Sequence, residues 1–184
     1  QLTHAAAVGF AKGGVLLTGK GGSGKSTTAL ACLKAGMRYV SEDYCILAHS
    51  PEPCVYSLYN SAKLEDNTLQ FFPELKEHIV NKNRQAGEKG LVFQYDFKKH
   101  ELIDQFPLRA LLVLKVAKRP QSQLITIPFQ EALSALAVST MWQLVGSNAH
   151  TYAFLSTLAA ALPCYRLELG YDLERIPNLI KELL

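Results

Sequence analysis

The sequence lacks the features of a membrane protein and of a nucleic-acid-binding protein. Its longest apolar runs, 110–114 and 153–162, fall short of the roughly 20 residues that a membrane-spanning helix needs. The net charge of +3 arises from scattered Lys and Arg, with no long basic run and no known nucleic-acid reader motif. We therefore expect a soluble protein that has neither a membrane partner nor a nucleic-acid partner.

The cysteines also lack the close spacing of a zinc or redox motif. They lie mostly in apolar segments, so we expect reduced, buried thiols, no zinc site and a cytoplasmic location. The four residues are Cys32, Cys45, Cys54 and Cys164. An initiator Met and a signal-peptide pattern are missing as well, because the chain begins at Gln1. We interpret this start as a truncation that leaves out an upstream N-terminal region.

What is present is enough apolar sequence for one core. With 184 residues and 48% hydrophobic content, the sequence predicts a single domain over 1–184. A turn signal at 12–14 predicts a hairpin, the polar stretch 81–90 predicts an exposed loop, and Pro107 and Pro120 bound one predicted strand. Strands are expected over 4–10, 15–18, 38–40, 44–48, 91–95, 111–116 and 165–169. Helices are expected over 25–35, 131–137, 151–162 and 176–184.

One segment carries a strong functional motif. It matches G-x-x-x-x-G-K-[ST], with an apolar strand before it and a helix after it, which is typical of a P-loop that binds the phosphates of a nucleotide. Backbone N–H groups of such a turn surround an anion at the start of a helix. We expect Lys25 to lie beside the β- and γ-phosphates and Ser26 to ligate Mg²⁺ or Mn²⁺. The predicted nucleotide-binding residues are Gly19, Lys20, Gly21, Gly22, Ser23, Gly24, Lys25, Ser26 and Thr27.

Two adjacent carboxylates, Glu42 and Asp43, follow the first strand after the P-loop helix. An acidic residue at a strand end holds the metal in P-loop enzymes, and a second one can take a proton from an incoming hydroxyl. The sequence therefore predicts that these residues are both catalytic and metal-binding. It leaves open which of them performs which role.

The segment from His4 to Asp43 resembles the catalytic domain of HPr kinase/phosphorylase and, more distantly, phosphoenolpyruvate carboxykinase. In that family a histidine precedes the glycine loop and an Asp-Asp pair follows its helix, and His4 and Glu42-Asp43 take these places at matching spacing. The resemblance implies an α/β P-loop kinase domain with a mixed sheet, and helices concentrated in the C-terminal half. Glu42 departs from the family's first Asp, and the glycine-containing signature associated with phosphorylase activity has no counterpart.

Later segments, 60–64, 107–109 and 163–169, look more like the shorter HPr-kinase-related proteins, which include lasso-peptide precursor kinases. The resemblance implies ATP as donor, a protein or peptide serine as acceptor, and a homo-oligomer. It also implies a catalytic place for His4, although a lone histidine on an apolar strand is by its pattern alone more often a core residue. Lys63 and Arg109 are candidate phosphate or substrate contacts, or else surface charges without a role.

The leading hypothesis is therefore an ATP-dependent, Mg²⁺-assisted kinase that phosphorylates a hydroxyl. Its catalytic residues would be Glu42, Asp43, Lys25 and His4. One alternative keeps this site and gives it a small hydroxylated metabolite. Another, from a different class, is a regulatory switch that binds a nucleotide without acceptor chemistry.

Overall fold

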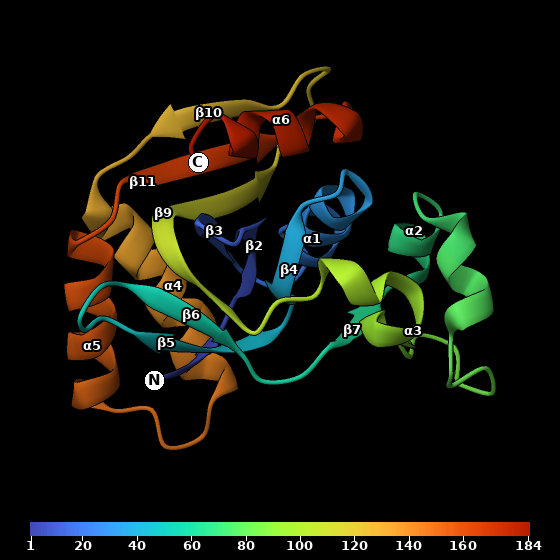
Figure 1. Cartoon of the computed structure of the whole chain (residues 1–184), viewed down its shortest axis with the longest axis horizontal. Helices are drawn as coiled ribbons and strands as arrows, with labels where there is room; N and C mark the ends of the chain where they lie inside the picture. The colour runs from blue at the N-terminus through green and yellow to red at the C-terminus, as the bar shows by residue number, and fades with distance from the viewer.

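A computed structural model describes the backbone of residues 1–184 and every side chain apart from that of residue 97. Its centre is a mixed sheet of nine strands (Figure 1). Seven of them follow the order β1-β5-β6-β9-β3-β2-β4, and β11 joins β10 to β9. These strands are β1 (Leu2–His4), β2 (Ala6–Phe10), β3 (Gly13–Thr18), β4 (Arg38–Ser41), β5 (Tyr44–Ala48), β6 (Cys54–Ser57), β9 (Gln105–Val116), β10 (Gln123–Thr126) and β11 (Cys164–Leu169).

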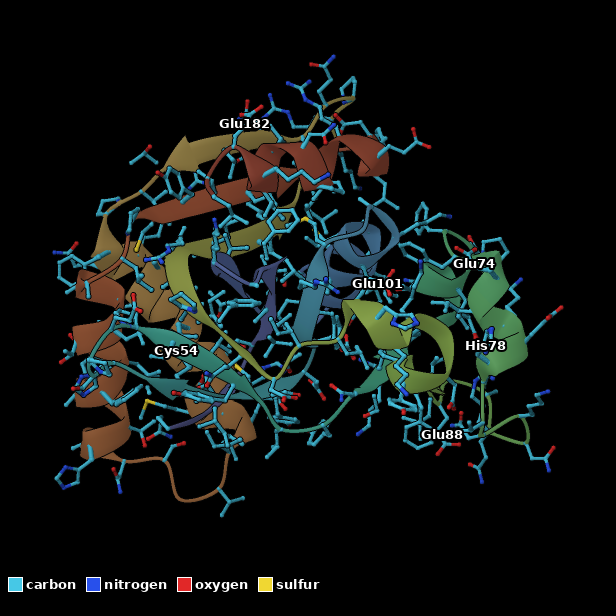
Figure 2. The ribbon with its side chains drawn as sticks, viewed as in Figure 1. Cys54, Glu74, His78, Glu88, Glu101 and Glu182 are labelled. Atoms are coloured by element: carbon cyan, nitrogen blue, oxygen red, sulfur yellow. The ribbon has the colours of Figure 1, made fainter. Side chains whose placement is uncertain are left out.

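The helices are α1 (Lys25–Lys34), α2 (Asp66–Leu69), α3 (Gln94–Lys98), α4 (Phe129–Gln143), α5 (Ala149–Ala160) and α6 (Ile176–Lys181), with the 3₁₀ turns η1 (Pro73–His78), η2 (Lys99–Glu101) and η3 (Leu173–Arg175). Helices α1 and α6 cover one face of the main sheet, and α4 and α5 cover the other. A separate two-stranded sheet pairs β7 (Ser61–Leu64) with β8 (Gly90–Phe93). The segment between these two strands stands to one side of the main sheet, where Figure 2 shows Glu74, His78 and Glu88.

The core has two layers because successive strand side chains point to opposite faces. In β3, Val15 and Leu17 pack into the cluster that α1 and α6 cover, whereas Leu16 packs into the cluster under α4 and α5. Strand β9 alternates in the same way, with Leu112 in the first cluster and Leu111 in the second. The two central strands are thus buried on both sides, which accounts for their nearly continuous apolar sequence.

Strand direction brings two predicted segments to the same edge of the sheet. Strand β2 is antiparallel to both β3 and β4, so β3 and β4 run in the same direction. The glycine-rich segment follows the end of β3, and the acidic pair follows the end of β4. Both segments therefore leave the sheet at its carboxyl edge, where ligands commonly bind in α/β folds.

The observed elements agree with the sequence on the class of fold and differ in several bounds. The strand expected over 4–10 is interrupted at Ala5, so that β1 pairs with β5 and β2 pairs with β3. Strand β9 begins at Gln105 and passes through Pro107, which the sequence set as a boundary. Proline is tolerated there because Pro107 pairs with β6 alone, and the pairing with β3 begins only at Leu108.

Helical bounds also shift. The strand expected over 91–95 ends at Phe93, and α3 begins at the next residue. Helix α4 extends the expected 131–137 at both ends. None of the helices in the described part of the chain combines the length and apolar character that crossing a membrane requires.

Candidate functional site

The glycine-rich segment forms a loop between the end of β3 and the start of α1. Gly22 and Gly24 have φ angles of 75° and 96°, a region that favours glycine. Gly24 is further restricted because an added Cβ would lie 2.4 Å from Leu169 Cδ1, whereas one on Gly22 would meet nothing within 4 Å. One side of the loop is thus packed against β11, and the other faces open space.

Lys25 lies across this loop. Its Nζ donates a hydrogen bond to the Gly19 carbonyl at 2.8 Å, and the residue is only 8% exposed. Burial lowers the pKa of Lys25, against the opposing effect of the Asp43 and Glu42 carboxylates. The ammonium group therefore lies between the loop and the acidic pair, where an anionic phosphate would stabilise its charged form.

Glu42 is buried immediately beyond β4, with 3% of its surface exposed. Its Oε1 accepts a hydrogen bond from the Lys63 backbone N–H at 2.8 Å. Its Oε2 is buried and has no hydrogen-bond partner among the described residues. Burial raises the pKa of Glu42, and hydrogen bonding from the Ser26 hydroxyl is the main opposing effect.

This arrangement fits a divalent cation. A hydroxyl from Ser26 and a carboxylate from Glu42 are hard oxygen donors, and the buried Oε2 of Glu42 has no hydrogen-bond partner among the described residues that would compete with a cation. Mg²⁺ usually takes one or two protein ligands and completes its shell with phosphate oxygens and water. The donor set at the start of α1 matches that pattern.

Asp43 differs from Glu42 because its side chain is 28% exposed and has a histidine partner. Its Oδ1 lies 3.0 Å from His4 Nε2. Burial acts to raise the pKa of Asp43, but the hydrogen bond and charge of His4, together with Lys63 and Lys25, outweigh it, and the net pKa is lowered. The lowered pKa favours the ionised form of Asp43, and its side chain is partly accessible to water, whereas the side chain of Glu42 is buried.

His4 is buried at the end of β1, and its second ring nitrogen has a partner that the sequence did not indicate. The Nδ1 atom lies 2.7 Å from the hydroxyl of Ser139, which belongs to α4. That hydroxyl is also 3.1 Å from the Gly19 carbonyl. The predicted helix over 131–137 ended before Ser139, and no motif surrounds the residue, so no sequence signal pointed to it.

The order serine, imidazole, carboxylate is also that of a hydrolase triad. A nucleophilic serine must reach its substrate, but Ser139 is only 6% exposed and contacts the backbone of both His4 and Gly19. The geometry therefore argues against a nucleophilic role for Ser139.

Of the two predicted phosphate contacts, the structure brings only Lys63 to the site. Lys63 is an exposed residue of β7 whose charge lowers the pKa of Asp43. Arg109 belongs to β9 and lies beside the start of β3, where its guanidinium donates to the Lys12 carbonyl at 3.0 Å and lies 3.5 Å from Glu52. Because β9 is parallel to β3, their register places Arg109 at the edge of the sheet opposite the glycine-rich loop, away from the other candidate site residues.

A further cation, Lys89, and an aromatic residue, Tyr59, were also missed. The charge of Lys89 acts on both Lys25 and Glu42, while its ammonium lies 3.6 Å from Glu65. Lys89 closes the polar stretch before β8, which looked like an ordinary surface loop. Burial, followed by the nearby Asp43 carboxylate, raises the pKa of Tyr59 to about 12. Tyr59 directly precedes β7 and Lys89 directly precedes β8, and β7 is joined to the acidic pair by the hydrogen bond from Lys63 to Glu42.

Comparison with known proteins identifies the fold. The whole chain superposes on 93% of the structure of the HPr(Ser) kinase/phosphatase from Coxiella burnetii, with a TM-score of 0.50 and 15% sequence identity. No protein-family model matches the chain, and no curated protein matches it either. The chain is thus similar to that enzyme in its mixed α/β architecture, which agrees with the HPr-kinase-like fold expected from the sequence.

Proposed function

We propose that this chain is a catalytic domain that transfers the terminal phosphoryl group of ATP to a serine hydroxyl of a protein or peptide. The observation that carries the proposal is the position of Asp43, which is partly exposed, hydrogen-bonded to His4 at 3.0 Å, and close enough to Lys25 for their charges to interact. Such a carboxylate beside a P-loop is suited to accept the proton of an incoming hydroxyl.

The two acids take separate roles in this proposal. Glu42, buried beside Ser26, would hold Mg²⁺ or Mn²⁺ together with that hydroxyl. Asp43 would take the proton from the acceptor serine as the serine oxygen attacks the γ-phosphorus. The new oxygen–phosphorus bond forms as the bond to the β-phosphate oxygen breaks, and ADP carries away the released electron pair.

Cations around the site would stabilise the charge on the transferring group. Lys25 would leave the Gly19 carbonyl and lie against the phosphates, which also relieves the cost of its burial. Lys63 and Lys89 approach from the β7–β8 side. The cationic side chains would thus be in place before the reaction begins, and phosphoryl transfer depends mainly on such prior positioning of charge.

The fold neighbour is described as a kinase/phosphatase of HPr. We extend only the kinase reaction to this chain, with a serine-containing protein or peptide as acceptor and a homo-oligomer as the assembly. A peptide acceptor fits the exposed side of Asp43, which lies next to the aromatic rings of Tyr44 and Tyr59.

The test is a transfer assay with radiolabelled ATP, Mg²⁺ and candidate serine-containing proteins and peptides. Wild-type chain should label a macromolecular acceptor. The Asp43→Asn variant should lose about 10²- to 10⁴-fold in rate, as expected for loss of a general base. Glu182, an exposed carboxylate directly after α6 (Figure 2), provides the matched control, and Glu182→Gln should keep the wild-type rate. Wild-type rates in Asp43→Asn, or labelling of small metabolites alone, would overturn the proposal.

A further inference from the structure

One buried hydroxyl beside the candidate site has no role in the proton transfer described above. Ser139 Oγ lies 2.7 Å from His4 Nδ1, 3.1 Å from the Gly19 carbonyl and 3.3 Å from the His4 carbonyl. It thus contacts the strand that carries the histidine and the first residue of the P-loop. The neighbouring hydroxyl of Thr140 is also buried but has no hydrogen-bond partner among the described residues. Ser139 therefore differs from the next residue of α4 in its contacts with His4 and Gly19.

The hydrogens available to this cluster restrict how it is arranged. The hydroxyl of Ser139 has a single hydrogen, and both carbonyls around it can only accept. The Gly19 carbonyl already accepts a hydrogen bond from Lys25 Nζ at 2.8 Å. At the other side of the ring, the Asp43 carboxylate needs a donor from His4 Nε2. A neutral imidazole that donates through Nε2 has a free lone pair on Nδ1, which matches the shortest contact of Ser139.

We propose that Ser139 is a positioning residue, which donates to His4 Nδ1 and so keeps the Nε2–H directed at Asp43. This inference rests on the proposed phosphoryl transfer, in which Asp43 accepts the proton. With Oδ1 held by His4, the other carboxylate oxygen is left for the acceptor hydroxyl. Because Ser139 also contacts Gly19, the same side chain holds the imidazole at a fixed place relative to the P-loop.

The consequence is a fixed distance between the base and the phosphates. His4 and the P-loop belong to different strands, and β1 pairs with β5 rather than with β3. Helix α4 crosses behind both and supplies a side chain that touches each of them. A displacement of about 1 Å between reacting groups can cost on the order of 100-fold in rate, so such a link would act on catalysis without touching substrate.

The experiment compares three variants in the whole chain. Ser139→Ala removes the hydroxyl, Ser139→Thr retains it, and Thr140→Val removes the neighbouring buried hydroxyl, for which the described residues offer no hydrogen-bond partner. The first readout is the pair of ¹⁵N chemical shifts of the His4 ring, which distinguishes the two neutral tautomers. The second is the separate measurement of kcat and of the KM for ATP in the transfer assay.

Wild-type chain should show His4 protonated at Nε2 and unprotonated at Nδ1. In Ser139→Ala the ring should populate a mixture of tautomers, and kcat should fall about 10- to 100-fold, with the KM for ATP changed less than about twofold. Ser139→Thr should recover the tautomer and most of kcat, and Thr140→Val should behave as wild type. Equal losses in Ser139→Ala and Thr140→Val, or an unchanged tautomer in Ser139→Ala, would overturn the inference.

These readouts separate this inference from the proposed function. If wild-type chain transfers no phosphate to any acceptor, the proposed function fails. The ¹⁵N shifts of His4 still decide in that case, because the contact between Ser139 and the imidazole does not depend on turnover. A tautomer that changes in Ser139→Ala and recovers in Ser139→Thr would support the positioning role, and one that does not change would reject it.

Discussion

His4 Nε2 and Asp43 Oδ1 lie 3.0 Å apart, although His4 begins and Asp43 ends the segment that also contains the glycine-rich loop. The contact arises because β1 pairs with β5, which begins one residue after Asp43. His4 is directly opposite Tyr44 in that register. The pairing of β1 with β5 thus places the imidazole of His4 beside the carboxylate of Asp43.

The first prediction concerns the pH dependence that this contact produces. His4 and the nearby lysines hold the pKa of Asp43 below its ordinary value of 3.8, against the opposing effect of burial. The His4→Gln variant removes the imidazole that donates to Asp43, so the pKa of Asp43 should rise. The acidic limb of the pH–kcat profile should therefore move to higher pH in His4→Gln.

The same shift has a consequence for stability. A depressed carboxyl pKa stabilises the folded state above the unfolded pKa, and this contribution is lost as the pH falls through the folded pKa. Wild-type chain should thus lose stability below about pH 4 more steeply than His4→Gln. Urea denaturation at a series of pH values measures this difference. Parallel curves for the two proteins would contradict the role assigned to His4.

A second prediction follows from the burial of Glu42, whose pKa is raised. For a raised carboxyl pKa the sign is opposite, because the folded state binds the proton more tightly and stability falls as the pH rises from the unfolded to the folded pKa. The ionised side chain is thus unfavourable to the fold at neutral pH. Glu42→Gln should be as stable as wild type or more stable, while its Mg²⁺-dependent binding of ATP should weaken.

Thermal unfolding at pH 8 and calorimetric titration with ATP in the presence and absence of Mg²⁺ test the two halves of this prediction. Gain of stability with loss of metal-dependent binding is typical of functional sites that retain an unfavourable charge. If Glu42→Gln lost stability and kept full Mg²⁺ dependence, Glu42 would be a structural residue rather than a metal ligand.

The linear motif and the general architecture could be predicted from the sequence, but several side-chain contacts could not. The glycine-rich segment and the acidic pair are each contiguous in the sequence, so their residue types and spacing can be read from it directly. The partner of His4 on α4 depends instead on how a helix more than 120 residues away packs across the sheet, as the contact from Ser139 to Gly19 shows. The position of Arg109 at the opposite edge of the sheet could not be predicted for a related reason, since nothing local in the sequence reveals the register between β9 and β3.

A third prediction compares the effects on kcat of replacing Lys63, Lys89 and Arg109. Lys63→Ala and Lys89→Ala should each lower kcat on the order of tenfold, because exposed charges near the phosphates act through screened electrostatics. Replacing Lys63 leaves its backbone N–H free to keep the hydrogen bond to Glu42. Arg109→Ala removes a charge of the same sign at the opposite edge of the sheet and should keep the wild-type kcat.

Ionic strength provides the check on this interpretation. The effect of each lysine variant should shrink as salt is raised, since screening already weakens the wild-type interaction. A loss of activity in Arg109→Ala comparable to that in Lys63→Ala would show that net charge, rather than proximity to the acidic pair, governs the rate.

The last prediction compares two glycines of the P-loop. Gly24 has a φ of 96°, and a Cβ there would lie 2.4 Å from Leu169 Cδ1, whereas a Cβ on Gly21 would meet nothing within 4 Å. Gly24→Ala should lose about 1 to 2 kcal/mol in free energy of unfolding from the backbone conformation alone, and the clash adds to this. The start of α1 should shift with it, so ATP affinity should fall.

Gly21→Ala is the matched variant, with the same added methyl group on the side of the loop that faces open space. It should retain the stability of wild type, because neither its φ nor its surroundings oppose a side chain. The affinity of this variant for ATP then tests whether the open side of the loop is where the phosphates bind. If phosphates occupy that space, Gly21→Ala should weaken ATP binding without unfolding the chain, and unchanged binding in this variant would mean that the nucleotide lies elsewhere.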